Sequence, residues 1–135
     1  MEYKRHPEIS WRHWLASPVL HLMVIPLVIL DVCTEVYHHI CFPLYGIPLV
    51  KRSQYIIFDR HRLSYLNIFE KIWCSFCAYA NGLLHYALVI AGETERYWCG
   101  IKHKNKKDVI PPPHHNVFLK YGDEKAYRAF ANKKD

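Results

Sequence analysis

The sequence predicts an all-α protein in which two long apolar helices form a helical hairpin or small bundle, followed by a proline-rich tail and a short terminal helix. Two apolar runs, at residues 14–30 and 73–91, are long enough for several helical turns each. Strand signals are weak, and "QYIIF" at 54–58 is the one candidate strand. We therefore expect the two helices near residues 14–42 and 66–91.

Composition limits the class of protein. The chain has 135 residues, enough for one domain with a modest core, and 51% of them are hydrophobic, which excludes a disordered tail. The formal charge of +6 is compatible with nucleic acid, anionic lipid or solubility alone. Five cysteines cannot all pair within one chain, and we expect no export signal in the polar, basic start of the sequence. A reducing compartment is the expectation.

The first apolar run is of borderline length for crossing a bilayer. A spanning helix needs about 20 predominantly apolar residues, and this run meets Asp31 slightly sooner. Ser17 and Pro18 are typical of a helix start, while Pro26 is expected to kink the helix because it lacks a backbone donor.

Basic residues flank both apolar runs, and tryptophans lie near their ends. A hairpin that enters and leaves from one side of a membrane explains this pattern, as does a pair of helices lying in the interface. A soluble domain with two buried helices is the alternative. We expect membrane association with the ligands on the cytoplasmic side, membrane lipid as a partner, another membrane protein as a further partner, and no nucleic-acid partner, because the basic residues are scattered.

The character of the chain changes after Lys107. We expect a helical, membrane-associated domain at 1–107 and a tail at 108–135, in which "DVIPPPHHNVF" is extended and "GDEKAYRAFANKK" begins a helix at Gly122 and Asp123. His114 and His115 follow three prolines and are expected to face solvent.

A stripe of polar and sulfur-bearing residues runs along the second helix. Projected at 100° per residue, its members fall within an arc of about 80°. Such a stripe should face protein, water or a metal rather than lipid. Its members are Asn67, Glu70, Cys74, Cys77, Asn81 and His85.

The motifs Cys74-x-x-Cys77 and Cys99-x-x-x-His103 predict a zinc or iron site, with His85 as a further candidate ligand. A continuous helix would separate Cys77 from Cys99 by about 33 Å, so the chain must turn. The expected turn is "AGET" at 91–94, with Gly92 ending the helix and a shorter helix carrying Glu95, Cys99 and His103.

Several alternatives remain for these residues. A turn at Asn81–Gly82 would place Cys99 nearer His61, and a regular hairpin at Gly92 would favour His85 and Asn81 as neighbours of Cys99 and His103. Inert packing and thiol redox chemistry compete with metal binding, although the mid-run position of the Cys-x-x-Cys pair disfavours redox. Cys33 and Cys41 are expected to be buried small hydrophobes.

A second ligand set is carboxylate-rich. Asp31, Glu35 and His38 share one helix face, and Glu35-x-x-His38 has the spacing of di-iron bundles, which use that motif twice. With Glu70 and Glu95 it defines the alternative of a carboxylate–histidine metalloenzyme. A hydrogen-bonded polar patch, in a structural membrane protein without ligand, is the third interpretation. We expect binding rather than catalysis, because no base–nucleophile pair can be placed.

The segments "FDRHRLSYLN", "CSFCAYANGLLHYA" and "ETERYWCGIKHK" resemble a group of small, uncharacterised bacterial proteins. The resemblance extends from "ISWRHWLASPVLH" to "YGDEKAYRAF". It implies a bacterial protein associated with the inner membrane, and it implies no activity and no catalytic residue. The function expected is therefore that of a small membrane-associated accessory protein that binds a transition metal.

Overall fold

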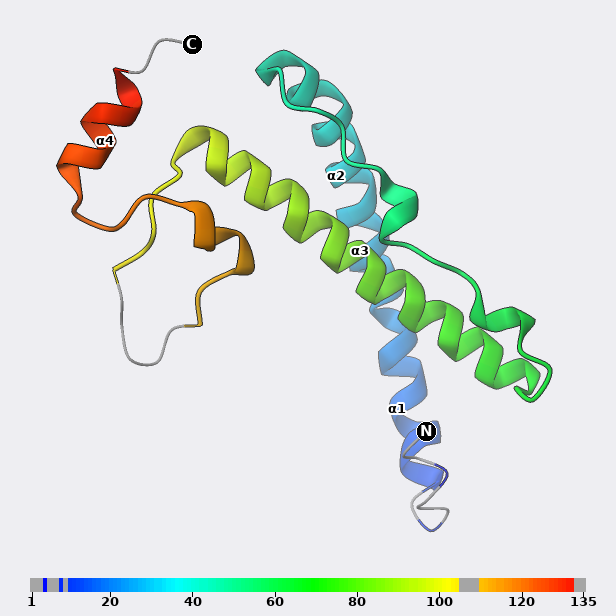
Figure 1. The fold of residues 1–135 in the computed structure, drawn as a ribbon. Coiled ribbons are helices and arrows are strands. Elements are labelled where there is room, and N and C mark those ends of the chain that lie inside the picture. Colours follow the sequence, from blue (N-terminus) through cyan, green and yellow to red (C-terminus); the bar gives the residue numbers. More distant parts are fainter. Residues whose placement is uncertain (1–3, 5–7, 9, 105–109, 133–135) are drawn as a thin grey trace. The chain divides into compact units, whose positions relative to one another are not determined.

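The computed structural model describes residues 4, 8, 10–104 and 110–132, and it confirms the all-α prediction (Figure 1). The described residues form the helices α1 (Ser10–Leu22), α2 (Val24–Tyr45), α3 (Ile68–Trp98) and α4 (Glu124–Ala131), with short 3₁₀ turns between α2 and α3 and before α4. The β pairing within the described ranges is a single bridge between Ile101 and Leu119, so the strand predicted at 54–58 was wrong.

The chain divides into two compact units, Met1–His85 and Tyr86–Asp135, and the boundary falls inside α3. Leu27, Phe42 and Leu83 are buried in the first unit, and Tyr86, Ile90 and Phe118 are buried in the second. The division predicted at residue 107 lies outside the described residues and stays a prediction.

Proline positions explain how the first apolar run is shaped. The helix bends at Met23, whose N–H donates to the carbonyl of Leu20 at 3.2 Å. Pro26 lacks a donor for the Leu22 carbonyl four residues earlier and its ring crowds that turn, as predicted for a kink. The helix start predicted at Ser17 was wrong, because Pro18 lies inside α1.

Local capping fixes the other helix ends. At the end of α2, Gly46 has φ +71° and its N–H donates to the carbonyls of Phe42 and Pro43. At the start of α3, the Asn67 side chain accepts from the Glu70 N–H while the Glu70 carboxylate accepts from the Asn67 N–H, each at 2.9 Å. This reciprocal capping box satisfies two donors that the helix itself cannot.

Within the first unit, α2 and α3 run in the same general direction where they meet. His21 of α1 stacks on Phe76 of α3 at a centroid distance of 5.9 Å, and Asp31 of α2 accepts from Tyr79 of α3. The contacts therefore ascend along α1 and α2 and along α3 together. The connecting segment returns alongside them (Figure 1). The connecting segment packs closely on α3, because a Cβ atom on Gly82 would lie 2.6 Å from the Tyr55 carbonyl oxygen.

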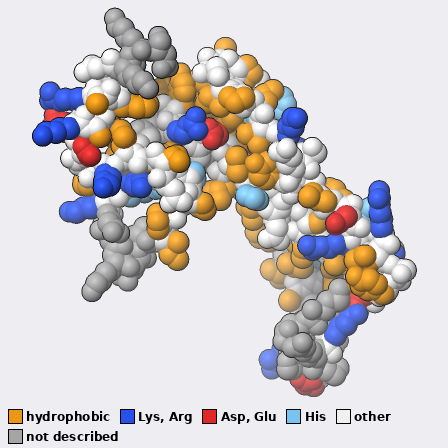
Figure 2. Space-filling view, in the orientation of Figure 1, with side chains coloured by type: hydrophobic (Ala, Val, Ile, Leu, Met, Phe, Trp, Pro, Cys, Tyr) orange, Lys and Arg blue, Asp and Glu red, His pale blue; other side chains and the backbone are white. Residues whose placement is uncertain are grey.

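Two helices, Trp11–Tyr45 and Ile68–Trp98, are long and apolar enough to cross a membrane by length and composition. In the apolar windows of these helices only 6% and 22% of the residues are buried within the protein. Large hydrophobic side chains are instead exposed on the surface, as the face in Figure 2 shows. On α2 these include Ile25, Ile29, Val32, Val36 and Ile40.

Candidate metal centre

The carboxylate of Glu95, near the end of α3, is held by two histidines of the second unit. Its Oε2 lies 2.8 Å from Nε2 of His114, and its Oε1 lies 3.1 Å from Nε2 of His115. Both histidines belong to the 3₁₀ helix Pro113–Val117. The prediction that they face solvent was wrong, since His115 is only 3% exposed and His114 is half-buried.

The prolines and a glycine explain why this arrangement forms. Pro112 is extended and its carbonyl accepts from the His115 N–H at 3.0 Å, so the ring constraints of the proline run set the entry into the 3₁₀ turn. The His114 ring then packs directly on the backbone of α3. A Cβ atom on Gly92 would lie 2.8 Å from Cγ of that ring, a contact that only glycine permits.

His103 joins the cluster from a third segment. After α3 the chain reverses at Gly100, which has φ +60° and whose N–H donates to the Glu95 carbonyl at 2.9 Å. The Lys102 N–H then donates to the Leu119 carbonyl at 2.8 Å and the Leu119 N–H donates to the Gly100 carbonyl at 2.9 Å, on either side of the Ile101–Leu119 bridge. The ring of His103 thereby lies 5.3 Å from that of His115, measured between centroids.

Glu95, His103 and His115 each offer a ligand atom, and these atoms all lie within 4.8 Å of one another. Two imidazole nitrogens and a carboxylate oxygen are a ligand set that suits zinc, iron and related divalent ions. His114 lies outside this group and contacts the other oxygen of Glu95, where it can orient the carboxylate. Phe118 stacks on the His115 ring at 4.9 Å and shields it from water.

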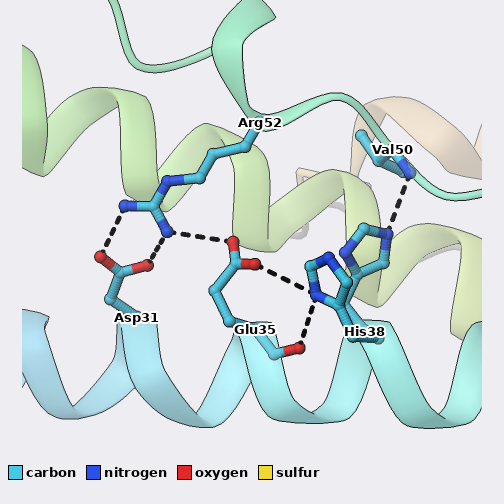
Figure 3. Close-up of polar contacts among 6 residues, drawn as sticks. Asp31, Glu35, His38, Val50 and Arg52 are labelled. Atoms are coloured by element: carbon cyan, nitrogen blue, oxygen red, sulfur yellow. Dashed lines mark hydrogen bonds and ion pairs between the residues drawn. The ribbon is translucent and has the colours of Figure 1, made fainter.

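A second polar cluster, in the first unit, has a different character (Figure 3). The Arg52 guanidinium forms a two-pronged ion pair with Asp31, through Nη1 to Oδ1 and through Nη2 to Oδ2 at 2.7 Å, and also donates to Glu35 Oε1 at 3.0 Å. Tyr79 donates to Asp31 Oδ2 at 2.8 Å. The hydrogen bond with Asp31 raises the pKa of the Arg52 guanidinium above its ordinary value. This cluster ties the connecting segment to both helices.

Glu35, His38 and His39 also offer ligand atoms within 4.8 Å of one another. Each of the two histidines already has one ring nitrogen in a hydrogen bond with the backbone. Nε2 of the buried His38 accepts from the Val50 N–H at 2.9 Å, and Nδ1 of His39 lies 3.0 Å from the Glu35 carbonyl oxygen (Figure 3). An ion bound through these two nitrogens would have to displace hydrogen bonds that hold the fold together.

Of the predicted carboxylate–histidine set, Asp31, Glu35 and His38 lie together, whereas Glu70 and Glu95 have other partners. Glu70 is buried, caps the start of α3 and forms an ion pair with Lys4. Glu95 belongs to the histidine cluster of the second unit. The acidic residues of that set therefore have three separate roles: Asp31 and Glu35 bind Arg52, Glu70 caps α3, and Glu95 contacts histidines.

The cysteines are not gathered as the motifs suggested. α3 continues through both Gly82 and Gly92 to Trp98, so the turns predicted at these glycines and the separate helix for Glu95, Cys99 and His103 were wrong. No disulfide links the five cysteines, and within the described ranges none belongs to either ligand group. Cys33 is exposed and Cys41 half-buried, so their predicted burial was also wrong.

Part of the predicted polar stripe borders a shallow groove in the first unit. The groove has a volume of about 380 Å³ and is lined by Cys77, Asn81 and His85 from α3 and by Asp59 and Arg60 from the connecting segment. The ring of His85 also contacts that of Tyr55 at 5.0 Å. The C-terminal half of the stripe thus faces polar protein groups and water.

Sequence reasoning did not assign Arg52, Tyr79, His114 or His115 to a site. The His-His pair directly after three prolines was the available signal, because such a stretch restricts the backbone and can aim neighbouring side chains. No signal in the sequence alone pairs Arg52 with Asp31, since 21 residues separate them.

Comparison with protein-family models, with curated proteins and with solved structures found no match to this chain. The resemblance to small bacterial proteins therefore stays a prediction.

Proposed function

We propose that this chain is a small membrane-associated protein that binds one transition metal ion, zinc or iron, through Glu95, His103 and His115, with His114 supporting Glu95. The observation that carries the proposal is the convergence of four ligand-type side chains from three segments of the second unit. Binding is the proposed role, as an accessory or metal-handling protein.

Membrane association is supported by how little of the long helices the protein covers. A core helix of a soluble protein is mostly buried, whereas only 6% of the apolar window of Trp11–Tyr45 is. Exposed apolar surface of this extent is costly in water and favourable in a bilayer. We propose that α1 and α2 contact lipid through this surface, on the cytoplasmic face of a bacterial inner membrane.

The shared direction of α2 and α3 bears on how the chain meets the bilayer. For both helices to cross it, the connecting segment would have to cross back, carrying Lys51, Arg52, Arg60 and Arg62. Charged residues in a bilayer cost several kcal/mol each. The geometry therefore favours helices that associate with one leaflet over a simple two-pass hairpin.

A carboxylate–histidine metalloenzyme is the second candidate, favoured by the grouping of Asp31, Glu35 and His38 in the first unit. The Arg52 guanidinium weighs against it, because a permanent cation between two carboxylates occupies the oxygens that a pair of metal ions would need.

The test is elemental analysis of protein purified without a histidine tag. We expect about one zinc or iron ion per chain, retained when Cys74, Cys77 and Cys99 are all changed to serine and lost in His115→Ala. His61→Ala, which removes an exposed histidine of the first unit, is the matched control and should keep the ion. Loss of the ion in the cysteine variant, or no binding in excess zinc, would overturn the proposal.

A further inference from the structure

The second unit contains a cleft beside the histidine cluster, with a volume of about 560 Å³. Its walls come from the end of α3, from the segment around Phe118 and from α4. Binding sites for one small molecule typically have volumes of about 300–1,000 Å³. The cleft is therefore of a size that holds a single small ligand.

Five of the eleven lining residues are aromatic, and four of these five are exposed. Tyr97, Trp98, Tyr127 and Phe130 line the cleft and are each at least half exposed, with Phe130 71% exposed. Phe118 is the buried part of the wall, and its ring also stacks on His115. Aromatic surface that remains in contact with water in this way is typical of a binding site, because a ligand that covers it gains hydrophobic free energy.

The charge of the cleft is one-sided. Arg96 is the charged residue that lines it, and Lys120 directly follows the lining residue Leu119. Arg128 follows the lining residue Tyr127 and is paired with Glu124 at 2.5 Å. Among the described residues, the ion-pair partner of Arg96 is Glu93, at a long distance of 3.6 Å in a pair exposed to solvent. Such a surface pair is worth little, so the guanidinium is available to an anion. The complementary ligand has an apolar body and one anionic end.

The helix α4 links these features. It has eight residues, too few to be stable alone in water, so it depends on packing of its apolar face. Tyr127, Phe130 and Ala131 of that face line the cleft. A ligand in the cleft would complete the packing of α4 against the end of α3.

We propose that this cleft binds a long-chain fatty acid, with the acyl chain among the aromatic side chains and the carboxylate at Arg96. A single chain matches a cavity of this volume, and one carboxylate matches one lining guanidinium. The inference goes beyond metal binding and does not depend on it, because no residue of the proposed ligand set lines the cleft.

The test uses a palmitic acid analogue that carries a photoreactive diazirine, added to the full chain in mild detergent, with the labelled peptides mapped by mass spectrometry. We expect labelling in the peptides that contain residues 96–100 and 127–131, with competition by unlabelled palmitate. Ala131→Trp, which fills the cleft, should reduce this labelling about tenfold. Ala129→Trp, on the same helix but outside the lining, is the matched control and should leave it unchanged.

A second variant keeps the test informative if Ala131→Trp disturbs α4. Arg96→Gln should reduce labelling by the fatty acid about tenfold while leaving labelling by the matching fatty alcohol unchanged. Labelling confined to α1 and α2, or equal effects of the two tryptophan variants on a folded protein, would overturn the proposal. Metal content measured on the same samples separates this outcome from a failure of the metal site.

Discussion

Asp31 and Glu95 are both acidic residues on long apolar helices, yet their surroundings differ in kind. Asp31 is 14% exposed and bound by a guanidinium and a phenol, which leaves its oxygens satisfied by permanent donors. The described partners of the Glu95 side chain are imidazoles. An imidazole that releases its proton becomes a metal ligand, whereas a guanidinium never does.

The chemistry of the partner thus decides which role a carboxylate on an apolar helix can have. A carboxylate fixed by arginine positions the chain, and a carboxylate surrounded by histidines can exchange hydrogen bonds for an ion. The first cluster is therefore structural in our account, and the second is the functional one. Variants of the two clusters should therefore affect different properties, stability for the first and metal binding for the second.

Replacing Arg52 with alanine should have the largest effect on stability. It leaves the Asp31 and Glu35 carboxylates partly buried without their shared cation, and breaking such a pair costs about 3 kcal/mol. The measurement is the free energy of unfolding in detergent. Arg62→Ala, which removes an exposed arginine of the same segment, should change it by less than about 0.5 kcal/mol. Equal effects of the two variants would contradict the structural role of the first cluster.

Gly82→Ala should destabilise the first unit by about 2 kcal/mol. The new Cβ atom would lie 2.6 Å from the Tyr55 carbonyl oxygen and 2.9 Å from Cα of Ile56, and backbone atoms cannot rotate away as a flexible side chain can. Metal binding should be unaffected. A variant as stable as the wild type would show that the connecting segment does not pack on α3 this closely.

Gly92→Ala is the matched change in the second unit and should act on metal binding instead. The Cβ atom would lie 2.9 Å from Nδ1 of His114, which forces the ring away from Glu95. Disturbing a group that orients a metal ligand typically costs about tenfold in affinity. Zinc titration of the two glycine variants measures this, and an unchanged affinity in Gly92→Ala would remove His114 from the site.

Tyr79→Phe should have the smallest effect, about 1 kcal/mol, because it deletes one hydrogen bond to Asp31 and retains the ring. Tyr65→Phe, in which the residue is 75% exposed, provides the control. The double variant Tyr79→Phe with Arg52→Ala should lose less free energy of unfolding than the sum of the two single effects, since both residues bind the same carboxylate. Strict additivity would argue against a shared network.

Features of the fold that are determined locally could be predicted from the sequence. The two long apolar helices follow from their composition, and α4 begins where Asp123 was expected to begin it, with the Asp123 side chain accepting from the Ala126 N–H at 3.0 Å. The kink near Pro26 was also predictable. Each of these depends on residues within one or two turns of one another.

The candidate site could not be predicted because its residues meet through tertiary contacts. Gly82 and Gly92 were interpreted as turns from their backbone freedom, but in the structure their missing Cβ atoms allow Tyr55 and His114 to approach α3. Glu95 meets His114 across 19 residues, a separation that no motif spacing reveals. The cysteine spacing was regular, yet a continuous α3 does not bring Cys99 back toward Cys77.

The most direct measurement is zinc affinity in a pair of matched carboxylate variants, Glu95→Gln and Glu35→Gln. Each removes one charge and keeps the shape of the side chain. We predict that Glu95→Gln weakens zinc binding about a hundredfold or more, and that Glu35→Gln changes it by less than about threefold while lowering stability. Zinc binding that survives Glu95→Gln and disappears in Glu35→Gln would contradict the account, because the ion would then belong to the first cluster.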